Sequence, residues 1–152
     1  MIKSLLDPKY VKLNMQAKTK KEALKELVDL LELDESSKKV LLDALWKREL
    51  AASTGVGRGI AIPHTRSTVI DRLYLLIGVS KEGIEFDSAD GKPVHILFML
   101  ISDYQNQPSK YLIALGKVAQ LARRLVDKEV DYLSVSDEKE LIDLIASLEE
   151  EE

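Results

Sequence analysis

The sequence predicts an α/β protein of one domain, in which a mixed central β-sheet is covered by helices on both faces. Two nearly continuous apolar runs rich in β-branched residues, 73–79 and 94–102, are typical of strands buried on both faces. Segments with helical periodicity lie before and after these runs. A chain of 152 residues, 45% hydrophobic and 32% charged, has the composition of an ordinary globular domain with a single core.

Two helices are expected before the strands. Thr19 and Glu22 have the spacing of a capping box, and apolar residues then recur at helical intervals, at Leu24, Leu27, Val28 and Leu31. A second helix is predicted over 37–50, with its apolar positions inward at Val40, Leu41, Ala44 and Leu45. Arg48 therefore lies in the last turn of this helix, next to a glycine-rich loop.

The remaining elements alternate strand and helix. Residues 59–62 are predicted as a short strand that Pro63 ends, which makes His64 the first residue past the strand. A long helix is expected to open at Pro108 or Ser109, and Asp137 has the spacing of a cap for a final helix. We therefore expect a domain over 1–148 and a solvent-exposed acidic tail over 149–152.

The composition excludes several kinds of protein. There is no cysteine, which rules out disulfides, thiolate nucleophiles and Cys-ligated metals and fits a cytoplasmic protein. A formal charge of −4 argues against a nucleic-acid partner, because binding to phosphate backbones depends on clustered positive charge. No segment approaches the length of a membrane span or a signal peptide, so no membrane insertion is expected.

The segment 53–66, read STGVGRGIAIPHTR, is the main candidate for chemistry. It holds three of the seven glycines and one of the two histidines, and no Asp or Glu occurs over 53–70 although Arg58 and Arg66 do. Such a segment favours an anion, because glycines let a ligand approach the backbone and tolerate conformations that aim N–H groups at it.

Familiar sites do not fit this segment. The glycines lack the spacing of a P-loop or a dinucleotide fingerprint, and the predicted order is helix, loop, strand. Two widely spaced histidines without cysteine do not make a zinc site, so no metal is expected. Ser53, His64 and Asp71 could be combined as a hydrolase triad, but no nucleophile-elbow sequence is present.

The remaining chemical interpretation of this segment is that a single histidine, without a metal or a catalytic triad, carries the reaction. The neutral imidazole of His64 can attack a phosphoryl group and hold it as a phosphoramidate, and a nearby guanidinium can offset the phosphoryl charge. In the alternative, the loop is glycine-rich only to turn sharply and His64 is a surface residue. The residues by themselves give the two interpretations equal weight.

The run Arg48-Glu49, ASTGVG at 52–57 and GIAIPH at 59–64 resembles the active-site signature of the enzyme IIA domains of the bacterial sugar phosphotransferase system, in their fructose, mannitol and nitrogen-regulatory branch. The likeness continues through GIEF at 83–86, DGKPVH at 90–95 and the late helices. The resemblance implies a cytoplasmic phosphocarrier enzyme without a cofactor. In it, His64 accepts a phosphoryl group that Arg48 and Thr54 help to bind.

The resemblance also implies partners. The donor is expected to be a histidine-containing phosphocarrier protein, HPr or its nitrogen-type homologue. The recipient is a IIB component, or the phosphorylated protein regulates target proteins. Because the chain has neither cysteine nor a membrane span, we expect no IIB or IIC segment within it. The alternative is a regulatory binding protein on the same fold that does not transfer phosphate.

Two positions depart from the family pattern. Thr65 follows the acceptor where glycine or alanine is usual, and Tyr111 stands where the family commonly has a second histidine. Tyrosine can donate a hydrogen bond to a phosphoryl oxygen but can neither carry a positive charge nor act as a base near neutral pH. Tyr111 is therefore a candidate phosphate-binding residue, with aromatic packing as the alternative.

Four further residues receive structural or open interpretations. His95, at the entrance of an apolar strand, is expected to be a hydrogen-bonded core or rim residue, and Trp46 a packing residue. Arg58 and Arg66 either attract a phosphorylated partner or are solvated loop charges.

Overall fold

The computed structural model describes residues 2–149. Its centre is one mixed sheet of six strands, in the order β1-β5-β6-β3-β2, with β4 also paired to β6. The strands are β1 (Val11–Lys12), β2 (Gly55–Gly57), β3 (Ile60–Ala61), β4 (His64–Arg66), β5 (Tyr74–Ile84) and β6 (Val94–Ser102). The pairs β5–β6 and β2–β3 are antiparallel, whereas β1–β5, β3–β6 and β4–β6 are parallel.

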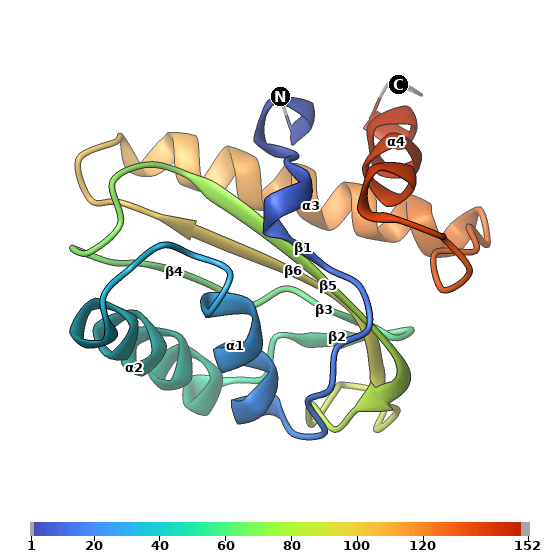
Figure 1. Ribbon diagram of the computed structural model, residues 1–152, viewed down its shortest axis with the longest axis horizontal. Helices are drawn as coiled ribbons and strands as arrows, with labels where there is room; N and C mark the ends of the chain where they lie inside the picture. The colour runs from blue at the N-terminus through green and yellow to red at the C-terminus, as the bar shows by residue number, and fades with distance from the viewer. Residues whose placement is uncertain (1, 150–152) are drawn as a thin grey trace.

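Helices cover both faces of this sheet, as predicted. Figure 1 shows α1 (Lys20–Val28) and α2 (Glu35–Ala51) on one side of the sheet, and α3 (Pro108–Asp127) and α4 (Glu138–Glu149) on the other. Two short 3₁₀ turns, Ile2–Leu5 and Pro8–Tyr10, lead into β1. Within residues 2–149, no helix has both the length and the apolar character that a bilayer span requires.

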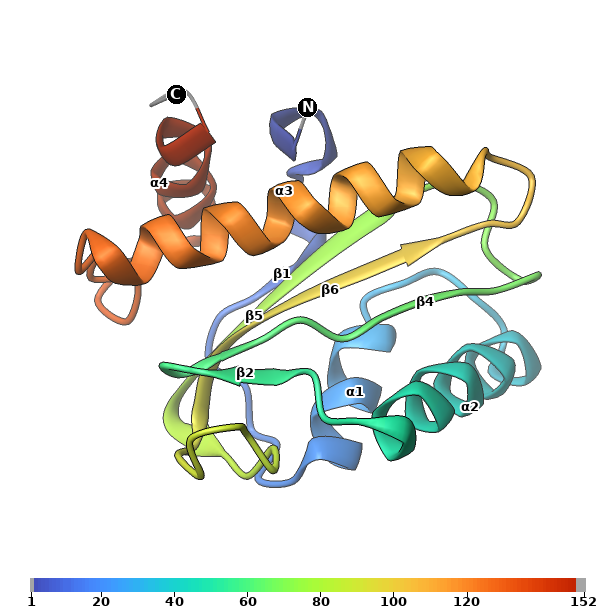
Figure 2. The ribbon, with the colours of Figure 1, turned by 180° about the vertical axis from the view of Figure 1, so that it is seen from behind.

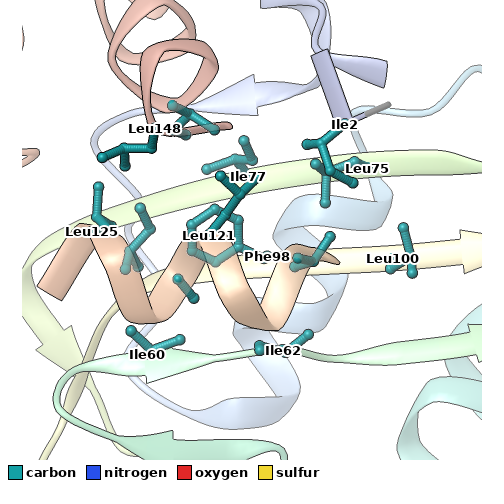
Figure 3. Packing of buried hydrophobic residues seen from close by; sticks show 14 of the residues in the cluster. Ile2, Ile60, Ile62, Leu75, Ile77, Phe98, Leu100, Leu121, Leu125 and Leu148 are labelled. Atoms are coloured by element: carbon teal, nitrogen blue, oxygen red, sulfur yellow. The ribbon is translucent and has the colours of Figure 1, made fainter. Parts of the chain in front are cut away.

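The apolar run of β6 divides between two cores because alternate side chains point to opposite faces of a strand. Phe98 and Leu100 belong to the same core as Leu121 and Leu125 of α3 (Figure 3), whereas Met99 and Ile101 belong to the core beneath α1 and α2. This double burial explains why β6 shows no polar alternation, and its observed bounds match the predicted strand 94–102.

Local capping signals are confirmed. Thr19 and Glu22 form the reciprocal hydrogen bonds of a capping box at the start of α1. The carboxylate of Asp137 accepts a hydrogen bond from the N–H of Glu140 at 2.8 Å, as expected for the start of α4. These ends are predictable because the bonds join residues three positions apart.

Several details differ from the sequence-based expectations. Val40 was expected inward, but it is 47% exposed, because the face of α2 that meets the core is set by Leu41 and Leu45. Glu149, assigned to an acidic tail, is the last residue of α4, and its carboxylate accepts hydrogen bonds from the backbone N–H groups of Ile2 and Lys3. The rest of the predicted tail, 150–152, lies outside the described residues.

The third difference concerns the edge of the sheet. Pro63 was expected to end the strand, yet His64 begins β4, and β3 and β4 pair one after the other with the same strand, β6. Pro63 lacks an N–H group, but its carbonyl oxygen still accepts a hydrogen bond from Leu100 at 2.9 Å. A proline is tolerated here because the edge strand needs only its acceptor.

Candidate functional site around His64

The glycine-rich segment forms a tight hairpin between β2 and β3. Gly57, Arg58 and Gly59 all have positive φ angles, of 95°, 59° and 82°. The N–H of Arg58 donates to the carboxylate of Asp90 at 2.9 Å, so the anion that this turn binds is a side chain of the protein itself. The glycines therefore serve the turn, which was the structural alternative considered for this segment.

His64 lies just beyond this hairpin, half-buried at the start of β4, which runs beside β6 (Figure 2). Its Nδ1 lies 2.7 Å from the carbonyl oxygen of Ile62. A carbonyl can only accept, so Nδ1 carries the proton and Nε2 has the lone pair. No hydrogen bond from residues 2–149 to Nε2 is found, which leaves that nitrogen available as a nucleophile.

Arg48 is in the last turn of α2, as predicted, and its positive charge acts on the imidazole of His64. Its Nη1 donates a hydrogen bond of 2.7 Å to the carbonyl oxygen of Ala52, which holds the guanidinium at the end of the helix. Within the described residues Arg48 has no carboxylate partner, so its positive charge remains available to an anion.

The pKa of His64 is shifted by this environment. Burial lowers the pKa below its usual value, and the positive charge of Arg48 lowers it further. The hydrogen bond to Ile62 and the negative charge of Glu49 act in the opposite direction without cancelling the decrease. The imidazole is therefore mostly neutral at pH 7, which is the form that can attack a phosphoryl group.

Tyr111, in the first turns of α3, lies beside His64. The two ring centroids are 6.5 Å apart with an interplanar angle of 46°. Burial raises the pKa of Tyr111 to about 12, and the charges of Arg48 and Arg66 oppose this increase only in part. Tyr111 thus keeps its hydroxyl proton at physiological pH and can donate a hydrogen bond.

Thr54 was expected to bind phosphate, but its hydrogen bonds run to Glu49. Both residues are buried, the Thr54 hydroxyl donates to one carboxylate oxygen of Glu49, and the Thr54 N–H donates to the other at 3.0 Å. Lys20 completes the cluster with its Nζ 3.2 Å from Glu49. Because the hydroxyl proton of Thr54 is already used, this side chain holds the loop in place behind the site.

Other candidate residues have structural partners. Ser53 donates to the carbonyl of Phe86 and Asp71 accepts from Tyr74, so neither forms a triad with His64. Arg58 pairs with Asp127 at 2.8 Å. His95 is bonded through Nδ1 to the carbonyl of Ser80, as expected for a rim histidine.

Sequence reasoning missed Glu49 and the contacts of Arg66. Glu49 was noted only as part of a motif, and its burial depends on Lys20, which is distant in sequence. Arg66 was left between two roles, and its contacts lie on the segment before α3. Within residues 2–149, no group of three or more His, Cys, Asp or Glu side chains could hold a metal ion.

A family model described as "Phosphoenolpyruvate-dependent sugar phosphotransferase system, EIIA 2" matches residues 4–148. The chain belongs to this EIIA family. The sequence-based resemblance to the EIIA domains is thereby confirmed. The fructose-specific EIIABC component of Bacillus subtilis is 32% identical over 148 residues, which are 95% of this chain and 23% of that protein. This chain thus spans about a quarter of that relative.

Solved EIIA structures have the same fold. The nitrogen regulatory protein IIA-Ntr from Neisseria meningitidis superposes with a TM-score of 0.82 at 28% identity, covering 95% of this chain and 98% of that one. The mannitol enzyme IIA of Escherichia coli, solved in complex with phosphorylated enzyme IIB, gives a TM-score of 0.67 at 18% identity over 93% of this chain and 97% of that one. The second likeness shows the fold alone.

Proposed function

We propose that this EIIA domain accepts a phosphoryl group on Nε2 of His64 and holds it as phosphohistidine. The observation that carries the proposal is the hydrogen bond from Nδ1 to the Ile62 carbonyl, which fixes the tautomer with its lone pair on Nε2. The donor is a phosphohistidine on a histidine-containing phosphocarrier protein, HPr or its nitrogen-type homologue.

The transfer step follows from this tautomer. The Nε2 lone pair attacks phosphorus, the N–P bond to the donor's histidine breaks, and the donor imidazole leaves with that electron pair. Positive charge develops on the His64 ring as the new N–P bond forms. The Ile62 carbonyl, 2.7 Å from Nδ1, stabilises the ring N–H as that charge grows.

Two side chains beside His64 are suited to the phosphoryl oxygens. Arg48 supplies a guanidinium without a carboxylate partner among the described residues, and such a group can give charge-assisted hydrogen bonds. Tyr111 supplies a hydroxyl that remains protonated because burial raises its pKa to about 12. Thr54 is left out of the phosphoryl contacts because its hydroxyl donates to Glu49.

Exposed apolar side chains support a protein as the donor. Leu50 is 69% exposed at the end of α2, two residues after Arg48. Leu112 and Ile113, 61% and 55% exposed, directly follow Tyr111 in α3. Apolar surface next to a reactive group is typical of a protein-binding site. The recipient is a IIB component, or the phosphorylated domain regulates target proteins in the cytoplasm.

Mass spectrometry can test this proposal. The protein is incubated with phosphoenolpyruvate, enzyme I and HPr, and the label is mapped under alkaline conditions that preserve phosphohistidine. We expect one phosphate on His64, none in His64→Ala, and normal labelling in the matched variant His95→Ala. Label that persists in His64→Ala would refute the assignment.

The labelling experiment, together with a binding titration, also tests a second candidate function, that of a regulatory binding protein that does not transfer phosphate. The observation that favours it is Tyr111 in the place of the family's second histidine. If the protein binds HPr in a titration but accepts no phosphate from it at any pH between 6 and 9, the regulatory function replaces the carrier function.

A further inference from the structure

We propose that Arg66 is a positioning residue for phosphoryl acceptance, which acts by fixing the segment 103–107 and thereby the Tyr111 ring beside His64. This inference rests on the proposed function. It assigns a role to a side chain for which the sequence left two interpretations open, and it explains how tyrosine is held at the place of the second histidine.

Arg66 links the strand of His64 to the segment before α3. It is the last residue of β4, two positions after His64, so both side chains leave the strand on the same face. Its Nε donates to the carbonyl oxygen of Asp103 at 3.0 Å, and its Nη2 donates to the carbonyl oxygen of Asn106 at 2.9 Å. One planar guanidinium thus holds both ends of a short loop.

The loop is tightly folded upon itself. The buried carboxylate of Asp103 accepts hydrogen bonds from the backbone N–H of Asn106 at 3.1 Å and from its side-chain amide at 2.8 Å. The helix that follows has no side-chain cap at Gln107. The start of α3 is therefore fixed by this loop and by the arginine that holds it.

Arg66 also contacts two aromatic rings, that of Tyr104 within the loop and that of Tyr111 in α3. Its guanidinium carbon lies 5.0 Å from the ring centroid of Tyr104 and 5.9 Å from that of Tyr111. The Tyr111 ring in turn lies 6.5 Å from the His64 ring. A guanidinium can stack on these rings and donate two fixed hydrogen bonds at once, which a lysine ammonium cannot do.

The expected consequence is a loss of catalytic geometry with the fold retained. In Arg66→Lys the positive charge stays, but the loop and the first turn of α3 are no longer held, so the Tyr111 hydroxyl is displaced. A displacement of about 1 Å in a reacting group can slow a reaction up to about 100-fold. We expect Arg66→Lys to slow phosphoryl acceptance from phosphorylated HPr about tenfold.

A double-mutant cycle tests whether Arg66 acts through Tyr111. Rates of phosphoryl acceptance are measured by rapid quench for Arg66→Lys, Tyr111→Phe and the double variant. If Arg66 positions the hydroxyl, the double variant is within about twofold of Tyr111→Phe alone. Independent effects would multiply, so a double variant about tenfold slower than Tyr111→Phe alone would overturn the proposal, as would an unchanged rate in Arg66→Lys.

Arg72→Lys is the matched control. Arg72 also donates to a backbone carbonyl, that of Leu73 at 3.2 Å, and stacks on a tyrosine, with its guanidinium carbon 3.9 Å from the Tyr74 ring centroid. Its substitution should leave the rate within about twofold of the parent, because its hydrogen bond runs to Leu73 and not, as those of Arg66 do, to Asp103 and Asn106. An equal slowing in Arg72→Lys would overturn the assignment to Arg66.

A spectroscopic readout keeps the inference separate from the proposed function. In the parent protein, NMR should show nuclear Overhauser effects between the ring protons of His64 and Tyr111. In Arg66→Lys these should weaken or vanish while the far-ultraviolet circular dichroism stays unchanged. If the parent accepts no phosphate, unchanged ring contacts in Arg66→Lys would still refute the positioning role, and lost contacts would support it.

Discussion

Replacing Glu49 by glutamine tests the buried charge cluster behind the site. The Glu49 side chain is 1% exposed and that of Lys20 is 14% exposed, with 3.2 Å between carboxylate and ammonium. Removing one partner of a buried ion pair costs about 3–5 kcal/mol, because the other charge is left unpaired. Some water reaches Lys20, so we expect the lower end, about 3 kcal/mol.

Thermal unfolding followed by circular dichroism measures this cost. For a domain of this size 1 kcal/mol shifts the midpoint by about 2–4 °C, so Glu49→Gln should unfold roughly 6–12 °C earlier than the parent. The matched control is Glu82→Gln, because the Lys18–Glu82 pair has side chains 63% and 74% exposed. That control should stay within about 0.5 kcal/mol.

The same variant has a second, independent effect on His64. The negative charge of Glu49 raises the pKa of His64, so its removal should lower that pKa further. The neutral imidazole is the reactive form, and the rising limb of the pH–rate profile should therefore move to lower pH. A parent-like midpoint of unfolding together with an unchanged His64 titration by NMR would refute this account of the cluster.

Three further perturbations test the site and its loop. Arg48→Lys keeps the positive charge but loses the paired N–H donors of the planar guanidinium. The loss of one charge-assisted hydrogen bond, about 1.5–3 kcal/mol, should slow phosphoryl acceptance about 10- to 100-fold in quench-flow measurements. An unchanged rate would assign a structural role to Arg48. Tyr111→His should add a titration near pH 6.5 to the pH–rate profile, and a profile with only one titration would contradict a site role for this position. Gly55→Ala should lower the stability of the fold by about 1–3 kcal/mol, because the new Cβ overlaps the Ser88 side chain and lies 3.0 Å from its Cα. The control Gly116→Ala in α3 meets nothing within 4 Å and should raise the stability by up to about 1 kcal/mol. Equal unfolding midpoints for the two variants would exclude this explanation.

Features predicted correctly from the sequence depend on short-range or periodic patterns. The bounds of β6 follow from a continuous apolar run, and the start of α1 follows from Thr19 and Glu22, three residues apart. The position of Arg48 in the last turn of α2 follows from the length of a helical pattern that stops before the glycines. None of these inferences requires knowledge of a tertiary contact.

Features that the sequence did not reveal depend on partners far along the chain. The local sequence predicts that Pro63 ends a strand. The hydrogen bond from Leu100 to the Pro63 carbonyl and the pairing of β4 with β6 show that the chain continues along β6 after the proline. From the sequence, Thr54 is expected to offer its hydroxyl to a bound anion. In the structure the hydroxyl donates to Glu49, and the buried carboxylate of Glu49 pairs with Lys20 of another helix. Whether such a side chain binds an external ligand or another residue of the protein depends on tertiary packing, which a local sequence pattern does not contain.

The adjacent pair Arg48 and Glu49 shows how packing sets the charge of the site. Successive residues of a helix point about 100° apart, so one side chain of this pair can face His64 while the other enters the core. Because Lys20 and Thr54 satisfy the Glu49 carboxylate, that carboxylate does not pair with Arg48. The positive charge of the guanidinium is consequently available to an incoming anion. The same charge lowers the pKa of His64. Arg48 therefore favours both the neutral imidazole that attacks and the charged phosphoryl group that the imidazole accepts.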